Sequence, residues 1–278
     1  MNLRQIYYAL PPRMRLMARR AYYLPMDTWE AFTGARHELQ PPRGMIFTGG
    51  GDFINEGKAF LKHFVDLGDL KPQHTVLDIG SGLGRMAIPL TEYLSEEGIY
   101  HGFDIMQEGV EWCQKKISSK FPNFHFKHVA LKNDLYTNQG SAAKDFVFPY
   151  ANAQFDFSFL TSVFTHMVDD QVANYLKEIA RVTKSGGRCL ATFFLLNDEV
   201  KQRIDGSDSF AFPFDYGHYR LMDKQVQSAN VAFEISWLES VCAANGLQIQ
   251  RIHHGYWSGL EKSDCLNFQD IVILKKLV

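Results

Sequence analysis

A glycine-rich turn between two apolar segments constrains the fold of this chain more than any other feature. The turn lies in VLDIGSGLGRM, residues 76–86, where alternating glycines follow a short apolar run that carries Asp78. The run before the turn is typical of a buried strand, and RMAIPLTEYL after it has apolar residues at helical spacing. A strand, a tight glycine turn and a helix in this order predict an α/β fold with a nucleotide-binding loop.

Strand-like and helix-like segments alternate along most of the chain from residue 45 onward. Five segments read as strands: HTVLDIG, GIYHGFD, NFHFKHVA, FDFSFLTS and RCLATFFLL. Two further strands, LQIQRIHH and QDIVILKK, have no helical segment between them, so we expect them to pair antiparallel. The pattern predicts a Rossmann-like three-layer sandwich, with a mostly parallel seven-stranded sheet and an antiparallel C-terminal hairpin.

The chain divides into a basic helical extension, residues 1–44, and one large domain, residues 45–278. Residues 1–26 contain five arginines and no acid. We favour an extension that packs on the domain with its arginines in solvent; the alternative is an arm that contacts an anionic membrane surface. Residues 205–226 are aromatic and follow the fifth strand. We expect them to form either a lid over the substrate that accepts the transferred group or a satellite hydrophobic cluster.

Composition and charge exclude several classes of function. The net charge is −2, so no global basic field is available for nucleic acid, and none is expected as a partner. Four widely spaced cysteines lack zinc-site spacing, so no metal is expected. We expect these thiols to be reduced, which favours a cytoplasmic protein. If residues 1–26 bind a membrane surface, we expect the protein to be peripheral to that membrane. No apolar run reaches the ~18 residues that a membrane span requires.

The glycine turn departs from the dinucleotide fingerprint, because Arg85 stands where G-x-G-x-x-G has its third glycine. Asp104 ends the second strand, and FDFSFLTSVFTHM is followed by EIARVTKSGGRCL. With these features, residues 45–278 resemble the class I S-adenosylmethionine (SAM) methyltransferases. FTGGGDF and SVFTHM look like a bacterial group of methyltransferases, types 12 and 25, with unassigned substrates. The resemblance implies SAM as cofactor and S-adenosylhomocysteine as product.

The expected SAM site lies at the carboxyl ends of the strands. Asp104 can accept hydrogen bonds from both ribose hydroxyls, and Asp78 either holds the glycine loop or meets the ammonium through water. Val129 and Ala130 stand where many relatives place an adenine-binding acid, so their backbone groups are expected to serve instead. The expected cofactor-binding residues are Asp78, Gly80, Ser81, Gly82, Gly84, Arg85, Asp104, Ile105, Met106, Val129, Ala130, Thr161, Gly50 and Gly51.

The expected acceptor is a hydroxyl group of a small molecule or glycan. His166, after the fourth strand, is the candidate general base, since imidazole titrates near neutrality; the alternative is that it orders its loop. The expected acceptor-binding residues are Phe210, Phe214, Tyr216, His218, His254 and Tyr256. Three other functions stay open: a nicotinamide oxidoreductase, a non-catalytic SAM-binding module, and a membrane-associated protein or lipid methyltransferase.

Overall fold

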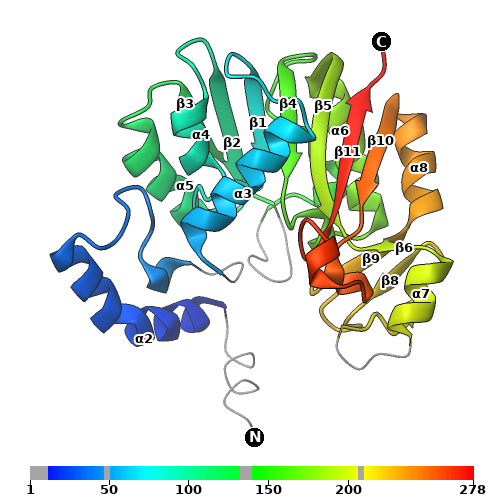
Figure 1. Ribbon diagram of the computed structural model, residues 1–278, viewed down its shortest axis with the longest axis horizontal. Coiled ribbons are helices and arrows are strands. Elements are labelled where there is room, and N and C mark those ends of the chain that lie inside the picture. The colour runs from blue at the N-terminus through cyan, green and yellow to red at the C-terminus, as the bar shows by residue number, and fades with distance from the viewer. Residues whose placement is uncertain (1–11, 47–50, 132–139, 206–209) are drawn as a thin grey trace, which may run out of the picture.

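Two sheets and the helices packed on them make up the part of the chain that the structure, a computed structural model, describes: residues 12–46, 51–131, 140–205 and 210–278. Figure 1 shows the larger sheet upright, with the carboxyl ends of its parallel strands pointing down. The smaller sheet lies below its right half, and α2 (Pro12–Thr33) lies below its left half.

The larger sheet has seven strands in the order β10-β11-β5-β4-β1-β2-β3. Its first five strands along the chain pair in parallel, whereas β11 runs antiparallel to both β5 and β10. The expected seven-stranded, mostly parallel sheet with an antiparallel hairpin is therefore confirmed. The strands are β1 (Thr75–Ile79), β2 (Ile99–Asp104), β3 (Phe124–His128), β4 (Phe155–Leu160), β5 (Thr183–Phe193), β10 (Leu247–His253) and β11 (Asp270–Lys276).

Each face of this sheet carries its own hydrophobic core. Side chains alternate along a strand, so Val76 of β1 packs on one face while Leu77 and Ile79 pack on the other. The core around Val76 is covered by α3 (Phe53–Asp66), α4 (Ala87–Tyr93) and α5 (Gln107–Cys113). The opposite core is covered by α6 (Asp169–Val182) and α8 (Ile235–Ala244). This is the predicted three-layer sandwich.

The aromatic insertion is more regular than its sequence indicates. It contributes β7 (Phe214–Asp215) and β8 (Tyr219–Leu221) to the smaller sheet, whose order is β6-β9-β8-β7. The other two strands are β6 (Leu195–Leu196) and β9 (Val231–Glu234), and α7 (Asp198–Ile204) follows β6. Residues 232–246 have an apolar sequence that suits a helix, but α8 begins only at Ile235, because the residues before it pair as β9.

Helix boundaries differ from the sequence prediction around α6. By its residue type Asp169 suits an N-cap, but it is the first helical residue, and Val168 occupies the cap position. The carboxylate of Asp169 lies 2.8 Å from Nε2 of His218. The helix ends at Val182, and Gly186 and Gly187, which by sequence suit a helix stop, lie within β5.

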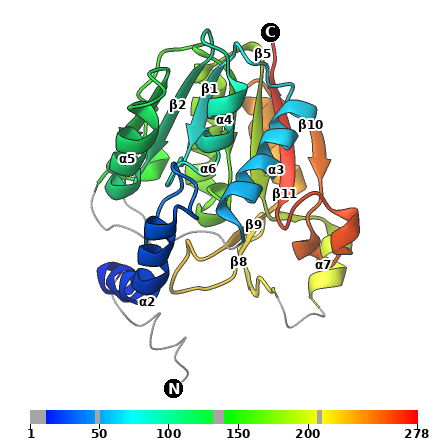
Figure 2. The ribbon, with the colours of Figure 1, turned by 60° about the vertical axis from the view of Figure 1, so that its left-hand side comes forward.

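In the described part of the extension, residues 12–44, the longest element is α2, seen from a second side in Figure 2. Within the described residues, no helix has the length and apolar character to cross a membrane. Short helical turns complete the description: η1 (Arg43–Met45), η2 (Gln114–Ser118), η3 (Ala143–Asp145), η4 (Phe164–His166), η5 (Tyr256–Ser258) and η6 (Lys262–Asp264).

Candidate active site

The glycine loop after β1 depends on backbone conformations that favour glycine. Gly80, Gly82 and Gly84 have φ values of 86°, 53° and 80°, in the left-handed region. A Cβ on Gly80 would lie 2.6 Å from Val163 Cγ2, and one on Gly84 would lie 2.7 Å from Ile117 Cδ1. The loop can therefore turn tightly at the carboxyl edge and keep its backbone exposed to a ligand.

Asp104, at the end of β2, ties two loops together. Its Oδ2 accepts a hydrogen bond from Gly82 N at 2.8 Å, and its Oδ1 accepts one from Met106 N at 2.7 Å. Burial raises the pKa of this carboxyl, while the two N–H donors oppose that shift. The sequence suggested only a ribose contact, so the structure adds a loop-organising function.

Asp78 is almost fully buried beneath the glycine loop. Its Oδ2 accepts a hydrogen bond of 2.5 Å from the Tyr100 hydroxyl. Burial raises the pKa of Asp78 to about 8; the Tyr100 hydrogen bond acts against the shift, and the nearby Asp104 carboxylate adds to it. A buried acid that titrates near neutrality suits a site for a cationic ligand.

Helix α3 packs closely on the glycine loop. A Cβ on Gly57 would lie 2.4 Å from the Arg85 carbonyl oxygen, so the two backbones are nearly in contact. The Arg85 guanidinium lies over the Phe53 ring, 4.9 Å from its centroid. Asp52 caps α3 by accepting hydrogen bonds of 3.0 Å from the N–H groups of Ile54 and Asn55.

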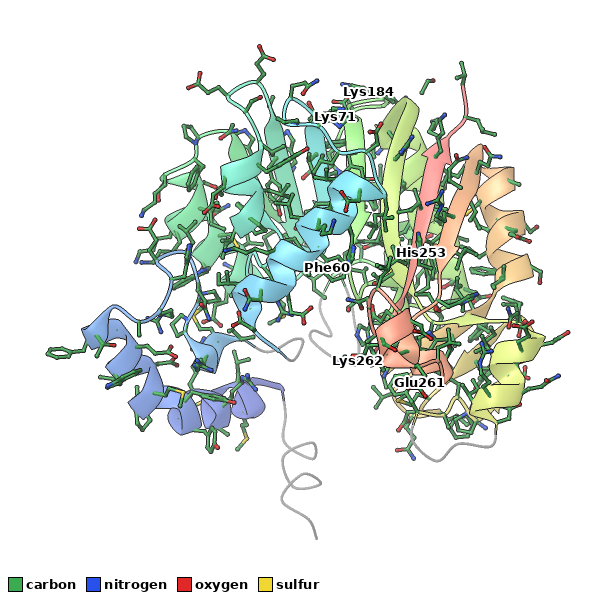
Figure 3. All side chains as sticks on the ribbon, viewed as in Figure 1. Phe60, Lys71, Lys184, His253, Glu261 and Lys262 are labelled. Carbon is green, nitrogen blue, oxygen red and sulfur yellow. The ribbon has the colours of Figure 1, made fainter. Side chains whose placement is uncertain are left out.

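One pocket of about 580 Å³ joins the glycine loop to the connection between β10 and β11. Thr161 and Ser162, directly after β4, lie between these two walls. Figure 3 shows Phe60 on α3 and Lys262 on the β10–β11 connection, whereas Lys71 and Lys184 lie at the opposite edge of the sheet. The lining residues are Ile46, Gly51, Phe53, Glu56, Phe60, Asp78, Gly80, Ser81, Gly82, Leu83, Arg85, Met86, Thr161, Ser162, Tyr256, Lys262, Asn267, Phe268 and Gln269.

Ser162 is held in a strained conformation at the centre of this pocket. Its φ is 57°, which is unusual for a residue with a side chain. Its N–H donates to Thr192 Oγ1 at 2.7 Å, and its hydroxyl donates to Gln269 Oε1 at 3.1 Å. Strain of this kind gathers at functional sites, and the Gln269 bond connects the end of β4 to the β10–β11 connection.

The structure brings part of the predicted cofactor site into the pocket. Seven expected residues line it: Gly51, Asp78, Gly80, Ser81, Gly82, Arg85 and Thr161. Six others lie outside its lining, near the loops that follow β1, β2 and β3: Gly84, Asp104, Ile105, Met106, Val129 and Ala130. Gly50 lies outside the described residues.

Two backbone groups proposed for the adenine are already used within the protein. The N–H of Val129 donates to the Asp104 carbonyl at 3.0 Å, and the carbonyl of Ala130 accepts from Ser141 N at 3.1 Å. The Val129 N–H therefore has a partner within the protein, whereas the Ala130 carbonyl keeps a second lone pair. The adenine contact of this segment stays a prediction.

His166 lies in η4 and does not line the pocket. Its Nδ1 is 2.8 Å from the Ser228 carbonyl oxygen, which can only accept, so Nδ1 carries the proton and Nε2 the lone pair. Burial lowers the pKa of His166, with the Ser228 and Ala229 carbonyls opposing the shift. The imidazole is therefore neutral near neutral pH, as a base requires.

Of the six expected acceptor residues, only Tyr256 lines the pocket. Phe210 packs against Phe194 and Phe268, with ring centroids 5.1 and 5.2 Å apart, in a small hydrophobic cluster. The others also have partners or positions elsewhere: Phe214 is exposed, Tyr216 stacks on Tyr219, His218 contacts Asp169, and His254 lies 3.3 Å from Asp270. Phe210 and Phe212 therefore belong to a satellite cluster, and the acceptor contact expected for the rest of the insertion stays a prediction.

Sequence reasoning missed most of the pocket lining outside the glycine loop. Asn267, Phe268 and Gln269 come from the β10–β11 connection, and Phe53 and Phe60 from α3. The predicted antiparallel hairpin was a usable signal for the first three of these residues, because the connection within it begins at the carboxyl end of β10. Among the described residues, no three His, Cys, Asp or Glu side chains gather where a metal ion could bind.

The fold and this site together define a Rossmann-like α/β protein with a nucleotide-cofactor loop at the carboxyl edge of its sheet. Residues 77–191 match the family model described as a methyltransferase domain. This matched segment runs from β1 into β5 and contains the glycine loop, so it is similar to a methyltransferase domain, and SAM is the cofactor of the class I methyltransferases that the chain resembles.

Several solved structures share the fold at low sequence identity. A putative S-adenosylmethionine-dependent methyltransferase from Listeria monocytogenes has a TM-score of 0.53 and 15% identity, covering 81% of this chain and 100% of that one. A putative sarcosine dimethylglycine methyltransferase from Galdieria sulphuraria has a TM-score of 0.52 and 12% identity, covering 80% and 86%. The 1,6-didemethyltoxoflavin-N1-methyltransferase of Burkholderia thailandensis, solved with S-adenosylhomocysteine, has a TM-score of 0.50 and 15% identity, covering 97% and 92%.

Proposed function

We propose that this protein transfers the methyl group of SAM to a hydroxyl group of a small-molecule or glycan acceptor. The observation that carries the proposal is the continuous pocket from the glycine loop to the β10–β11 connection. A donor on the loop and an acceptor against the connection would meet beside Thr161 and Ser162. Methyl transfer needs this alignment above all, because the sulfonium is already a good electrophile.

The donor end of the pocket has charges that match the amino acid part of SAM. Asp78 faces the pocket and can balance the ammonium, and Arg85 can balance the carboxylate. Backbone N–H groups of the glycine loop add partial positive charge beside that carboxylate. We also propose that Asp104, at the end of β2, accepts hydrogen bonds from the ribose hydroxyls through the remaining lone pairs of its carboxylate.

The acceptor end combines aromatic rings with amide groups. Tyr256 and Phe268 provide the rings, and Asn267 and Gln269 provide hydrogen-bond donors and acceptors. Lys262 adds a positive charge and lies over the Tyr256 ring, 5.5 Å from its centroid. Rings and amides are complementary to a polar ring that carries hydroxyls, which supports a small molecule or a sugar.

Binding and turnover test this function directly. We expect calorimetry to detect SAM and S-adenosylhomocysteine binding, and labelled SAM to yield a methylated product from cell-extract metabolites. NADH binding without SAM binding would point to an oxidoreductase. SAM binding without product from any extract would favour a non-catalytic module.

Replacing His166 with glutamine tests the base. A general base contributes about 100-fold or more to a rate, so we expect kcat to fall by at least that factor while the SAM affinity stays the same. His74→Gln is the matched control, because its Nδ1 accepts a hydrogen bond from Lys71 N at the opposite edge of the sheet. An unchanged kcat in His166→Gln would remove the base from the proposal and leave methyl transfer standing.

Tyr256 and Tyr216 distinguish the two candidate acceptor surfaces. We expect Tyr256→Ala to raise the KM for the acceptor about tenfold, because its ring lines the pocket, with little change in SAM affinity. Tyr216→Ala removes an exposed ring outside that lining and should leave both constants unchanged. The reverse result would place the acceptor under the aromatic insertion.

A further inference from the structure

Helix α2 faces the rest of the protein with its polar side. Asp27 accepts hydrogen bonds from the N–H groups of Arg43 and Gly44 at 2.6 and 2.9 Å. Glu30 is buried and accepts a hydrogen bond of 2.6 Å from Nε of Arg43. Both acids of α2 are therefore turned inward, which is the reverse of an ordinary surface helix.

The outward side of α2 is almost entirely apolar. Phe32 is 92% exposed, Tyr22 77%, Met17 69% and Trp29 61%. Among the α2 side chains that the structure describes, the exposed ones include no acid and one base, Arg20. The large exposed apolar residues of the helix are Met14, Met17, Tyr22, Leu24, Met26, Trp29 and Phe32. A monomer in water rarely presents so large an apolar surface, so this side is suited to a partner.

The charge and residue types of the helix identify the chemistry of that partner. The first nine residues of α2, PRMRLMARR, contain four arginines, and the first acid along the chain is Asp27, which faces inward. A basic end beside an apolar face with Tyr22 and Trp29 is typical of helices that lie in the interface of an anionic membrane. Tyrosine and tryptophan favour that interface, because each has an apolar ring and a polar group.

The position of α2 relates this face to the pocket. Figures 1 and 2 both place α2 beside the edge where the parallel strands end, which is also the pocket edge. We propose that the outward face of α2 docks the protein on an anionic lipid bilayer, with the pocket edge turned toward the membrane. Docking itself does not depend on the proposed methyl transfer. If both hold, acceptors at a membrane surface are within reach.

Vesicle flotation with the full chain tests this docking. We expect the protein to float with vesicles of phosphatidylcholine containing about one third phosphatidylglycerol, and far less with phosphatidylcholine alone. Binding should weaken as salt is raised, because the arginine contribution is screened. The double variant Trp29→Ser/Phe32→Ser should lower the bound fraction at least about tenfold.

A matched double variant, Val147→Ser/Leu277→Ser, removes two exposed apolar side chains elsewhere and should float like the parent. Circular dichroism should show all three proteins folded, since the replaced side chains are exposed. Equal flotation of parent and Trp29→Ser/Phe32→Ser would overturn the proposal. So would a parent that ignores anionic vesicles and forms a dimer in light scattering that this variant dissociates, because the face would then bind a second copy.

Discussion

Asp104→Ala is expected to lower the affinity for SAM by about 100-fold, equivalent to ~2.8 kcal/mol of binding free energy. The carboxylate accepts hydrogen bonds from Gly82 N and Met106 N, so its removal frees both loops that border the donor site. Each hydrogen bond to a charged group contributes about 1.5–3 kcal/mol. The variant would also lose the proposed ribose contact. Asp104→Asn keeps the shape and one acceptor oxygen, so we expect a smaller loss.

Calorimetric titration with SAM and S-adenosylhomocysteine measures this effect, and Asp156→Ala is its control. Asp156 also accepts a backbone hydrogen bond, from Thr75 N at 2.9 Å, but it pairs with Lys184 at the opposite edge of the sheet. Asp156→Ala should therefore lower stability without changing SAM affinity. An Asp104→Ala protein that binds SAM as tightly as the parent would show that neither loop needs this carboxylate.

The sequence was sufficient for the larger sheet because each of its elements is encoded locally. Strand-like runs and helical stripes repeat at short intervals, and a right-handed strand–helix–strand order leaves few alternative topologies. The smaller sheet was not predictable in this way. Val231, Ala232 and Phe233 are apolar residues that suit a strand or a helix, and their partners lie on β6 and β8. Such nonlocal pairing decides the outcome.

The two ends of the pocket also differ in whether their residues lie close together in the sequence. The donor end lies largely within residues 78–85, so spacing alone located Asp78, the glycines and Arg85. The rest of the lining joins Phe60 of α3 to Phe268, far apart along the chain, and includes the Ser162–Gln269 hydrogen bond. No local pattern in the sequence contains that contact.

The aromatic insertion shows that composition alone cannot distinguish an acceptor surface from a hydrophobic cluster. Its phenylalanines looked like an acceptor surface because they follow a strand at the active-site edge. In the structure, Phe210 and Phe212 pack against Phe194 and Trp257, which provide apolar partners from other elements. Burial among those rings removes apolar area from water, which stabilises the cluster.

Asp78→Asn is expected to stabilise the free protein and weaken its binding of SAM. The pKa of Asp78 is about 8 in the folded protein and near 3.9 in an unfolded chain, so the folded state holds the extra proton between those values. Stability therefore falls as the pH rises from about 4 to about 8, because the buried group must give up that proton. Asparagine has no charge to bury and can still accept from Tyr100. Its Tm should exceed that of the parent by roughly 5 °C near pH 8, and by much less near pH 5.

If the ammonium group of SAM lies beside Asp78, SAM binding offsets the free-energy cost of ionising this buried carboxyl. The cation favours the carboxylate, so the parent should release close to one proton on binding near neutral pH. Its affinity should then rise between about pH 6 and pH 7.5, a range in which the α-amino group of SAM stays mostly protonated. Asp78→Asn should bind roughly tenfold more weakly, with no such proton release. Calorimetry in buffers of different ionisation enthalpy measures the released proton. Equal affinity and equal proton release in parent and variant would show that Asp78 does not contact the ammonium.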